Sequence, residues 1–588
     1  MAEDAPARRD ILPEADLPDA AGLIADGRAL ATAHAGERCA FLDHYGVASE
    51  AEFKRQRAAA GEVMLHAQIG YRDREKSRRA YGEIYERLAA GGHPPVRYGI
   101  CLDWSMGYPR DARRDMPRGT GLILDGPEDF RALTAAAPVA PHFGDFVLGT
   151  PAAVENTRAA LAAGSTVIGN IGQYFAFRMP VGDDDVATTR ETVRALALIA
   201  AHPREVLVHS NLDDGFAALF CDMACALGAV LIERHAVETL IGAPMAHCYG
   251  HTYSDPAARL AFQRALAAVC DAPGSMIYGN TTSYGTGHAA NYAALGRYLL
   301  VDVIGQRTRP TGHAVNPVPV TEAERIPDVG EIVDALRFAG RVIDDTPAMS
   351  PLFAPDSVDA MADRIVAGGR AFRDRVLDGL AGIGIDTDNP MELLLAIRRL
   401  GARRLEELYG PGTPAADRPR GRRPVQAAAT LLDLEAEAEG LAASLDPKAA
   451  AAIGKAGFTA CVATTDVHEY GKILLEGVLR RLHVRLVDGG VSSEPGVLAK
   501  TARSAGADLI AVSSYNGVAP GFIATLNREM KTLDLAVPVF VGGRLNVIPE
   551  DSNTSLPVDA GDLLRREGAI VCRSVEEMLR HLAEMAAP

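Results

Sequence analysis

Apolar and polar positions along residues 60–300 follow a repeating pattern of strand, loop and helix. Short apolar runs bounded by turn residues predict strands, and longer runs with apolar residues three or four positions apart predict helices. The predicted strands are Glu62–Gly70, Val96–Ser105, Gly121–Gly126, Val139–Phe143, Thr166–Tyr174, Val206–Asn211, Ala229–Ala236 and Ser275–Thr282. The predicted helices between them include Asp185–Ala201, Gly215–Leu227 and Pro256–Cys270.

Eight strand–helix units over about 250 residues have the size of a closed (β/α)8 barrel. The alternative is an open doubly wound sheet, which usually has fewer strands and a glycine-rich phosphate loop after the first strand. Here the first predicted strand is followed by Tyr71-Arg-Asp-Arg74. We therefore predict an α/β protein with a TIM-type catalytic barrel over residues 56–345.

A second alternation of strands and helices begins near residue 456. Its predicted strands are Thr459–Thr465, His483–Val487, Leu509–Ser514, Val537–Gly542 and Ala569–Arg573. Five strands in about 130 residues predict a small Rossmann-like or flavodoxin-like domain over 456–588. The remaining segments are predicted as an N-terminal arm or cap (1–55), a helical extension (346–408) and a turn-rich, charged linker (409–455).

Composition narrows the class of protein. A chain of 588 residues with 48% apolar and 23% charged residues is expected to form about two to four globular domains. The net charge of −16 disfavours nucleic acid and anionic membranes as partners, since both require basic surfaces. The sequence shows neither a membrane-spanning apolar run nor a signal peptide, so we expect a cytoplasmic protein with a small-molecule substrate. A homodimer remains open.

Cysteine spacing excludes several kinds of site. The eight cysteines are scattered without a CxxC pair, which argues against a zinc ribbon, a disulfide framework and a thioredoxin motif. Cys221 and Cys225 begin a CxxxCxxC pattern, but its third position is Gly228. An iron–sulfur site of that kind is therefore absent.

The stretch Asp466-Val-His468-Glu-Tyr-Gly471 lies between a predicted strand and a helix-like run that begins at Lys472. This places Asp466 and His468 at the carboxyl end of a parallel-type strand, where open α/β sheets bind ligands. A histidine there can offer a neutral imidazole nitrogen to a metal, and a nearby carboxylate can orient it. Alone the pattern is weak, because a capping aspartate and a surface histidine would explain it equally well.

Two later strand ends strengthen the metal-site interpretation. The strand that ends near Ser514 carries small hydroxyl residues, with Ser513 lying 42 positions after Gly471. Gly542 and Gly543 follow Ser513 by 29 and 30 positions, at the end of the next strand. A loop histidine, a hydroxyl-bearing strand end and a Gly-Gly turn on one sheet edge describe a cavity lined by small residues beside a metal ligand.

These residues resemble the cobalamin-binding domain, whose signature is Asp-x-His-x-x-Gly, then Ser-x-Leu, then Gly-Gly. Tyr515 stands where that signature has leucine, in the role of an apolar lining residue. The resemblance implies that the nucleotide tail of the corrinoid lies beside Ser513 and the two glycines Gly542 and Gly543. It also implies that His468 is the lower cobalt ligand, with Asp466 behind it.

The Val-Ser-Ser form of this strand end is most similar to the small subunit of glutamate mutase. That enzyme uses a (β/α)8 catalytic component on a separate chain, and residues 60–345 resemble that component diffusely. The similar stretches are Met64–Gly70, Leu102–Ser105, Leu122–Gly126, Gly149–Pro180 and Val301–Pro317. The resemblance implies an adenosylcobalamin-dependent radical isomerase, a carbon-skeleton mutase, with barrel and corrinoid domain fused in one chain.

The substrate residues depart from that family. It holds a dicarboxylate with three arginines, because arginine forks bind carboxylates bidentately. Here Gln68, the Met106-Gly107 neighbourhood with Arg110 nearby, and His142 stand in the corresponding places. A family glutamate that contacts the substrate amine is replaced near Val167. We therefore expect a small polar substrate other than glutamate.

Further candidates for the barrel site come from strand ends and strand parity. Tyr174 is a candidate for the family's aromatic on the fifth strand. Glu233 and His235 share parity on a predicted strand, so both are expected to point inward as catalytic residues. The other polar candidates are His66, Asp103, Asn170, Gln173, His209, Asn211, His247 and Asn280.

Three alternatives remain at this stage. A cobalamin-dependent methyltransferase usually carries a four-helix cap before the corrinoid domain, and about thirty residues after the linker are too few for one. An aminomutase that also uses pyridoxal phosphate needs a Schiff-base lysine, for which Lys472 and Lys500 are available. A non-catalytic corrinoid carrier or light sensor would not need a polar-lined barrel.

Overall fold

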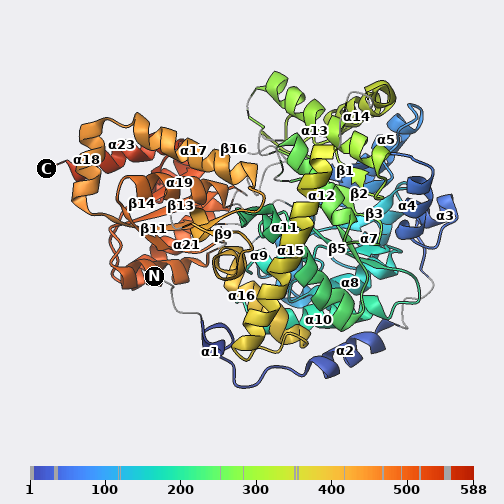
Figure 1. Cartoon of the computed structure of the whole chain (residues 1–588), viewed down its shortest axis with the longest axis horizontal. Helices are drawn as coiled ribbons and strands as arrows, with labels where there is room; N and C mark the ends of the chain where they lie inside the picture. Colours follow the sequence, from blue (N-terminus) through green and yellow to red (C-terminus); the bar gives the residue numbers. More distant parts are fainter. Residues whose placement is uncertain are drawn as a thin grey trace. The chain divides into compact units, whose positions relative to one another are not determined.

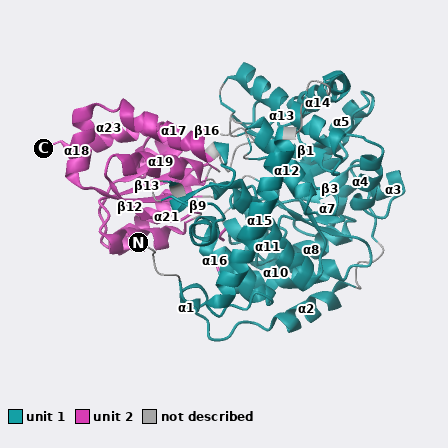
Figure 2. Ribbon diagram, in the orientation of Figure 1, with its two compact units in different colours: residues 1–176, 184–429 teal, residues 177–183, 430–588 magenta. Residues whose placement is uncertain are grey.

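Two separate units of structure make up the chain in the computed structural model (Figures 1 and 2). Unit 1 comprises residues 1–176 and 184–429, and unit 2 comprises residues 177–183 and 430–588. The structure describes residues 6–587 with gaps at 32–36, 117, 120, 180, 252, 254, 282–283, 286, 323, 350–352, 354–355, 416–417, 466–468, 492, 516–517 and 548–557.

Eight short parallel strands form the centre of unit 1. They are β1 (Met64–Ile69), β2 (Arg97–Ile100), β3 (Ala140–Phe143), β4 (Val167–Ile168), β5 (Leu207–Ser210), β6 (Met245–His247), β7 (Met276–Ile277) and β8 (Ala314–Val315). One sheet has the order β3-β2-β1-β8-β7 and a second has the order β4-β5-β6. A parallel bridge between Tyr249 and Ile277 connects the β6 and β7 regions.

The strands therefore follow one another in sequence order across both sheets. Between β3 and β4 the described residues form no strand ladder, but the Ser165 hydroxyl donates a hydrogen bond to the Pro141 carbonyl oxygen at 3.0 Å. The α/β class and the parallel sheets agree with the expectation. Among the described residues, no continuous ladder of paired strands closes all eight strands into one barrel.

Helices precede, separate and follow these strands (Figure 1). Before β4 they are α1 (Arg8–Ile11), α2 (Ala20–Ala29), α3 (Ala40–Tyr45), α4 (Glu50–Ala59), α5 (Arg74–Ala89), η2 (Trp104–Gly107), α6 (Arg110–Arg113), α7 (Pro127–Thr134) and α8 (Ala153–Ala162). After β4 they are α9 (Gly172–Ala176), α10 (Asp185–Ala200), η3 (Ala217–Leu219), α11 (Met223–Arg234), the π-helix η4 (His235–Ile241), α12 (Pro256–Ala267), α13 (His288–Thr308), α14 (Val329–Met349), α15 (Asp356–Gly382) and α16 (Pro390–Tyr409).

Two predicted strands were wrong. Ala229–Ala236 belongs to α11 and η4, and Gly121–Gly126 contributes a single bridge, from Leu122 to Leu102. The strands β6 and β8, with three and two ladder residues, were missed. Two strands were predicted wrongly and two were missed, so the predicted and the observed number are both eight.

The sequence of helix α11 resembles that of a buried strand, because nearly all residues of the helix are buried and apolar. A helix that is apolar on every side has no amphipathic period to distinguish it from a buried strand. Its packing against α15 depends on glycine: a Cβ added to Gly228 would lie 2.5 Å from Phe372 Cδ1 and 2.8 Å from the Gly369 carbonyl oxygen. Gly228 therefore marks a close helix–helix approach.

Unit 2 is built on a five-stranded parallel sheet. Its strands are β11 (Thr459–Thr464), β12 (Arg485–Asp488), β13 (Leu509–Ser514), β14 (Val539–Gly543) and β17 (Ile570–Val571), in the order β12-β11-β13-β14-β17. Numbered along the chain, this is the flavodoxin-like order 2-1-3-4-5. All five predicted strands are confirmed, within a few residues at their ends.

Helices cover both faces of this sheet. The helices are α17 (Ala429–Ser444), α18 (Pro447–Ala456), α19 (Tyr470–Arg481), α20 (Pro495–Ala505), α21 (Ala519–Thr532), α22 (Gly561–Arg566) and α23 (Val575–Ala586). Ile510 and Val512 face a core formed with α20, α21 and α22, whereas Leu509 and Ala511 face a core formed with α18, α19 and α23. The alternation of side chains along β13 thus supplies both cores.

The stretch 409–455, assigned by composition as a linker, contains regular structure. It includes the two-residue strands β9 (Thr413–Pro414) and β10 (Arg422–Arg423) with η6 (Pro419–Gly421) between them, then α17 and most of α18. A short antiparallel pair, β15 (Asn546–Val547) with β16 (Val558–Asp559), lies after β14. None of the described helices combines the length and the apolarity needed to cross a bilayer.

Candidate functional site

The strand order of unit 2 reverses direction between β11 and β13, which makes the carboxyl ends of these two strands a switch point. Helix α19, which follows β11, and helix α21, which follows β13, pack in different cores on opposite faces of the sheet. At such a switch in direction, a ligand can enter between the two strand ends. Asp466 and His468, the predicted cobalt-site residues, follow β11 in the sequence and lie outside the described residues.

Gly471, in the first turn of α19, lies directly against Ser513 on β13. A Cβ added to Gly471 would lie 2.4 Å from the Ser513 Oγ atom, so a larger residue would push the helix away from this hydroxyl. Ser513 itself is half-buried. The structure thus brings together two parts of the signature that lie 42 positions apart in the sequence.

Gly543 lies at the carboxyl end of the next strand, β14, in register with Ser514 of β13. Its φ of +97° is one that residues with a side chain rarely adopt, and an added Cβ would lie 2.3 Å from the Ser514 carbonyl oxygen. The Arg544 N–H donates to that same carbonyl at 2.8 Å. Gly542 is less constrained, because its Cβ would lie 3.3 Å from the Cys572 carbonyl oxygen.

Thr465 fixes the start of the loop that carries the predicted cobalt ligand. Its hydroxyl donates to Ser514 Oγ at 2.8 Å, and its backbone N–H donates to the Ser513 carbonyl oxygen at 3.0 Å. The described strand ends therefore present small hydroxyl side chains and glycines. We call this edge, formed by Gly471, Ser513 and Gly543, the cradle; these are the residue types that the cobalamin-binding signature has at the same spacing.

Tyr515, the departure from the signature, lies at the exposed end of this edge with 36% of its surface accessible. The Arg544 Nη1 donates to its hydroxyl at 3.2 Å, and the guanidinium lies 5.2 Å from the ring centroid. The ring is thus held by a cation–π contact. Its predicted role as an apolar lining residue stays a prediction.

Lys472 follows the signature directly and is fully buried in an ion-pair cluster. Its ammonium lies 2.6 Å from Glu476 Oε1 and 2.9 Å from Asp488 Oδ1. Two carboxylates thus hold this ammonium, whereas a Schiff-base lysine must present a free amine to its cofactor. Lys500, the other lysine considered for that role, is exposed on α20.

In unit 1, a buried ionic group lies at the amino-terminal ends of the strands. Glu50 of α4 binds both Lys54 and Arg97, with its Oε1 3.0 Å from Lys54 Nζ and 3.0 Å from Arg97 Nε. Lys54 also donates to the Gly274 carbonyl oxygen at 2.8 Å. All three side chains are at most 2% exposed. Arg97 is therefore a structural residue, as its place near the start of β2 predicts.

Three buried histidines, His66, His142 and His209, lie on β1, β3 and β5. The rings of His142 and His209 are 4.2 Å apart, and His66 shares its strand register with Arg97. Burial, together with the charge of Arg97, lowers the pKa of all three well below the usual value, so the rings are neutral at physiological pH. Gly169 leaves room for this layer, because its Cβ would lie 2.6 Å from His209.

Gln68, a predicted catalytic residue, lies beside this layer at the end of β1. Its Oε1 is 3.1 Å from His66 Nε2, and its Nε2 donates to Cys101 Sγ at 3.1 Å. The register pairs Gln68 with Gly99 and Gly99 with His142, so Gln68 and His142 lie at the same level and on the same face of β1 and β3, with Gly99 of β2 between them. The structure therefore brings these two candidates together.

Several polar atoms in this region are buried without a hydrogen-bond partner among the described residues. They include His142 Nδ1, Asn211 Oδ1 and both amide atoms of Asn316. Asn316 is 1% exposed, and strand alternation places it on the face of Ala314 and Met64, which His66 shares. Because buried polar groups are normally hydrogen-bonded, we regard these atoms as candidate contacts for a polar ligand.

Asn316 and Asp145 were not among the residues predicted for the site. Asp145 lies two positions after β3, and its Oδ1 accepts a hydrogen bond from Asn170 Nδ2 at 3.2 Å. Asn170 Oδ1 in turn accepts from the Asn211 N–H at 2.8 Å. Both missed residues lie just beyond the carboxyl end of a strand, and that position is the signal that could have identified them.

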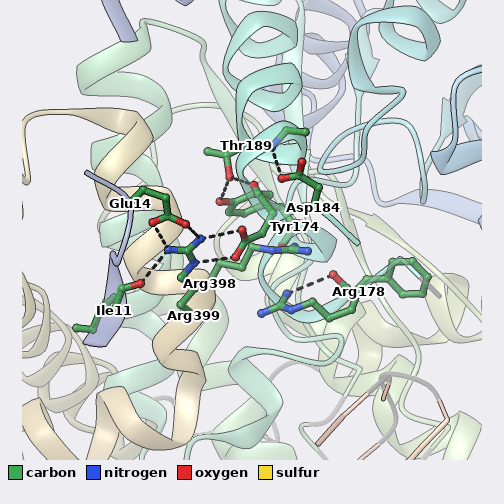
Figure 3. A network of polar contacts seen from close by, with 11 residues as sticks. Ile11, Glu14, Tyr174, Arg178, Asp184, Thr189, Arg398 and Arg399 are labelled. Carbon is green, nitrogen blue, oxygen red and sulfur yellow. Dashed lines mark hydrogen bonds and ion pairs between the residues drawn. The ribbon is translucent and has the colours of Figure 1, made fainter. Parts of the chain in front are cut away.

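Tyr174 lies in a different environment, on α9 among helices (Figure 3). It is fully buried, its hydroxyl lies 2.7 Å from Thr189 Oγ1 of α10, and the Arg398 guanidinium lies 5.0 Å from its ring centroid. The neighbouring Arg399 binds Glu14 and Asp185. These contacts connect α10, α16 and the N-terminal arm, and they do not involve the histidine layer.

Glu233 and His235 lie on a helical segment, so the parity argument for them was wrong. Glu233 is 1% exposed on α11, accepts a hydrogen bond from Ser210 Oγ at 2.8 Å and lies 3.6 Å from His247 Nδ1. Burial raises the Glu233 pKa to about 8. His235 lies in the π-helix, with Nε2 3.2 Å from the Thr387 carbonyl oxygen. The structure does not bring either residue to Gln68 and His142.

Comparisons with known proteins identify no family. No family model matches the chain, and no curated protein sequence matches it. Among solved structures, the chain resembles a cobalamin-binding protein from Desulfitobacterium hafniense DCB-2, with 16% sequence identity and a TM-score of 0.21. That similarity covers 27% of this chain and 71% of the other. At this level the resemblance assigns neither a family nor an activity.

Proposed function

We propose that this protein is an adenosylcobalamin-dependent radical isomerase of the carbon-skeleton mutase type. In this proposal, unit 1 is a closed (β/α)8 barrel that binds a small polar substrate other than glutamate, and unit 2 binds the corrinoid. The observation that carries the proposal is the cradle formed by Gly471, Ser513 and Gly543 at the switch point of the sheet. These residues have both the spacing of the cobalamin-binding signature and the close contacts that its small side chains permit.

The residues of unit 2 would bind and orient the cofactor and would not themselves react. His468 would ligate the cobalt, Asp466 would orient the imidazole, and Ser513 would line the space for the nucleotide tail. Thr465 supports this arrangement by tying the first residue of the loop to β13. When bound, the cofactor supplies homolysis of its cobalt–carbon bond, a source of a radical that abstracts hydrogen from substrates.

The residues of unit 1 would bind and orient the substrate. Neutral His142, Gln68 and Asn316 offer hydrogen bonds without charge. The buried cations Lys54 and Arg97 share the carboxylate of Glu50 at the amino-terminal ends of the strands, whereas the three neutral groups lie toward the carboxyl ends. This supports a substrate with amide, hydroxyl or amine groups in place of two carboxylates.

Neither alternative enzyme class gains support from the described residues. Two helices, α17 and α18, precede β11, whereas a methyltransferase cap has four. Lys472, considered for pyridoxal phosphate, is bound by Glu476 and Asp488.

Anaerobic incubation with adenosylcobalamin tests the proposed reaction. The protein would be mixed with small amides, diols, amino acids and diamines, frozen, and examined by EPR. We expect a coupled signal of Co(II) and an organic radical with at least one of these, and its loss in H142Q. Absence of this signal with every compound, from protein that binds the cofactor, would contradict the isomerase assignment.

A further inference from the structure

Arg544 and Tyr515 are in contact at the carboxyl edge of the sheet in unit 2. Ser514 of β13 pairs in register with Gly543 of β14, and Tyr515 and Arg544 directly follow this pair in the sequence. The Arg544 Nη1 atom lies 3.2 Å from the Tyr515 hydroxyl oxygen, and the guanidinium lies 5.2 Å from the ring centroid. The two side chains therefore extend the cradle by one residue on each strand.

Backbone hydrogen bonds fix the position of Arg544. Its N–H donates to the Ser514 carbonyl oxygen at 2.8 Å, and its own carbonyl oxygen accepts from the Asn546 N–H at 3.1 Å. Gly543, with its φ of +97°, turns the chain immediately before it. The guanidinium thus extends from a defined point beside the cradle.

Hydrogen-bond chemistry makes this pair a group of donors. A guanidinium can only donate, so the Tyr515 hydroxyl oxygen accepts from Arg544, and the hydroxyl hydrogen points away from Arg544. Tyr515 is 36% exposed and Arg544 is half-buried, so a ligand can reach both side chains. Donors select a ligand that accepts hydrogen bonds, and the positive charge of the guanidinium selects an anion.

Two charged groups close to the cradle in register or in sequence are already bound by groups of opposite sign. Asp559 pairs in register with Asn546, two positions after Arg544, and lies 3.0 Å from Arg573. Lys472, the first residue after the cobalamin signature, is held by two carboxylates. Asp559 is therefore engaged by another cation, and Lys472 does not compete with Arg544 for an anion.

We propose that Arg544 and Tyr515 form an anion clamp for the phosphodiester of the corrinoid's nucleotide tail. This inference rests on the proposed function, in which the tail lies beside Ser513. A guanidinium can bind two phosphate oxygens through parallel N–H bonds, and the tyrosine hydroxyl would donate to the same group. Tyrosine in place of the signature's leucine then has a specific role, because it holds the guanidinium through its ring and adds a donor.

Equilibrium dialysis of the full chain against three corrinoids tests the clamp. Cobalamin carries the complete tail, cobinamide phosphate keeps the phosphate without the base, and cobinamide lacks both. The wild type should bind cobinamide phosphate at least tenfold more tightly than cobinamide, and added NaCl should reduce this preference because it screens exposed charges. R544Q keeps the backbone bonds of Arg544, so it should lose the preference while its affinity for cobinamide stays unchanged.

Tyr515→Leu separates the clamp from the apolar lining role that the resemblance implies. Leucine would serve equally well as a lining residue, so in that role Y515L would bind all three corrinoids as the wild type does. The clamp predicts that Y515L binds cobalamin and cobinamide phosphate several-fold more weakly and cobinamide unchanged. R528Q is the control, because Arg528 is an exposed arginine near the end of α21, and it should bind as the wild type does.

Two results would overturn the clamp and leave corrinoid binding intact. One is equal affinity of the wild type for cobinamide phosphate and cobinamide. The other is a phosphate preference that persists in R544Q or in Y515L. If the wild type binds none of the three corrinoids, the proposed function is refuted together with the clamp.

Discussion

Replacing Gly543 by alanine should destabilise unit 2 at the proposed corrinoid cradle. Two features of the structure oppose any side chain there. The backbone φ is +97°, and the added Cβ would lie 2.3 Å from the Ser514 carbonyl oxygen. Because the obstructing atom belongs to the backbone of β13, the clash cannot be relieved by rotating a side chain.

The expected cost is the sum of two effects. A left-handed conformation costs a residue with a Cβ about 1–2 kcal/mol. Forcing extra volume into a packed region costs about 1–3 kcal/mol more. The free energy of unfolding should therefore fall by about 2–5 kcal/mol, which corresponds to a loss of roughly 4–20 °C in the melting temperature of a unit of this size.

Gly542→Ala provides the matched control. Its Cβ would lie 3.3 Å from the Cys572 carbonyl oxygen, which a small shift can relieve, and its φ is not in the left-handed region. Calorimetry of the full chain and far-UV circular dichroism would measure unfolding of both variants. The single tryptophan, Trp104, lies in unit 1, so its fluorescence reports that unit as an internal reference.

We expect G543A to lower the transition seen by circular dichroism while the Trp104 transition stays in place. G542A should change both by less than about 1 kcal/mol. Equal melting temperatures for the two variants would refute the argument that Gly543 is required by this backbone approach.

Two further predictions concern unit 1. Burial raises the Glu233 pKa to about 8, so its contribution to stability is fully present below the unfolded-state value of 4.5 and is lost as pH rises through 8. Between pH 6.5 and 8, the free energy of unfolding measured by urea denaturation should fall by about 1.5 kcal/mol more in the wild type than in E233Q. A difference between the two proteins that stays constant over this range would contradict the prediction. R399A should speed tryptic cleavage of the N-terminal arm several-fold, because Arg399 is bonded to two carboxylates and an arm carbonyl. R404A, a partly exposed arginine on the same helix, should leave the cleavage rate unchanged.

The architecture of unit 2 was predictable from the sequence. Strands β11 and β13 have six residues each, of which four consecutive ones are apolar, which is typical of parallel strands covered on both faces. Their carboxyl ends could therefore be aligned, and the proximity of Gly471 to Ser513 followed from the order of the strands.

The substrate region of unit 1 was predictable only in part. Gln68 and His142 lie on strands of four or more residues. The sheet face that each side chain occupies could therefore be inferred from the alternation of side chains along a strand. Glu233 was misplaced because α11 is buried on every side and carries no helical period. Asn316 was missed because the two ladder residues of β8 lie between Pro310 and Pro317, and prolines predict a connection in place of a strand.

The most direct test of the central claim is EPR of the protein with bound Co(II) cobalamin, prepared with natural and with nitrogen-15-labelled histidine. If His468 is the lower cobalt ligand, the superhyperfine splitting should change from triplets to doublets on labelling. H468Q should lose the histidine-derived splitting. Splitting that does not respond to labelled histidine, or that persists in H468Q, would contradict the assignment of His468 as the cobalt ligand. It would also contradict the assignment of the carboxyl ends of β11 and β13 as the cobalt site.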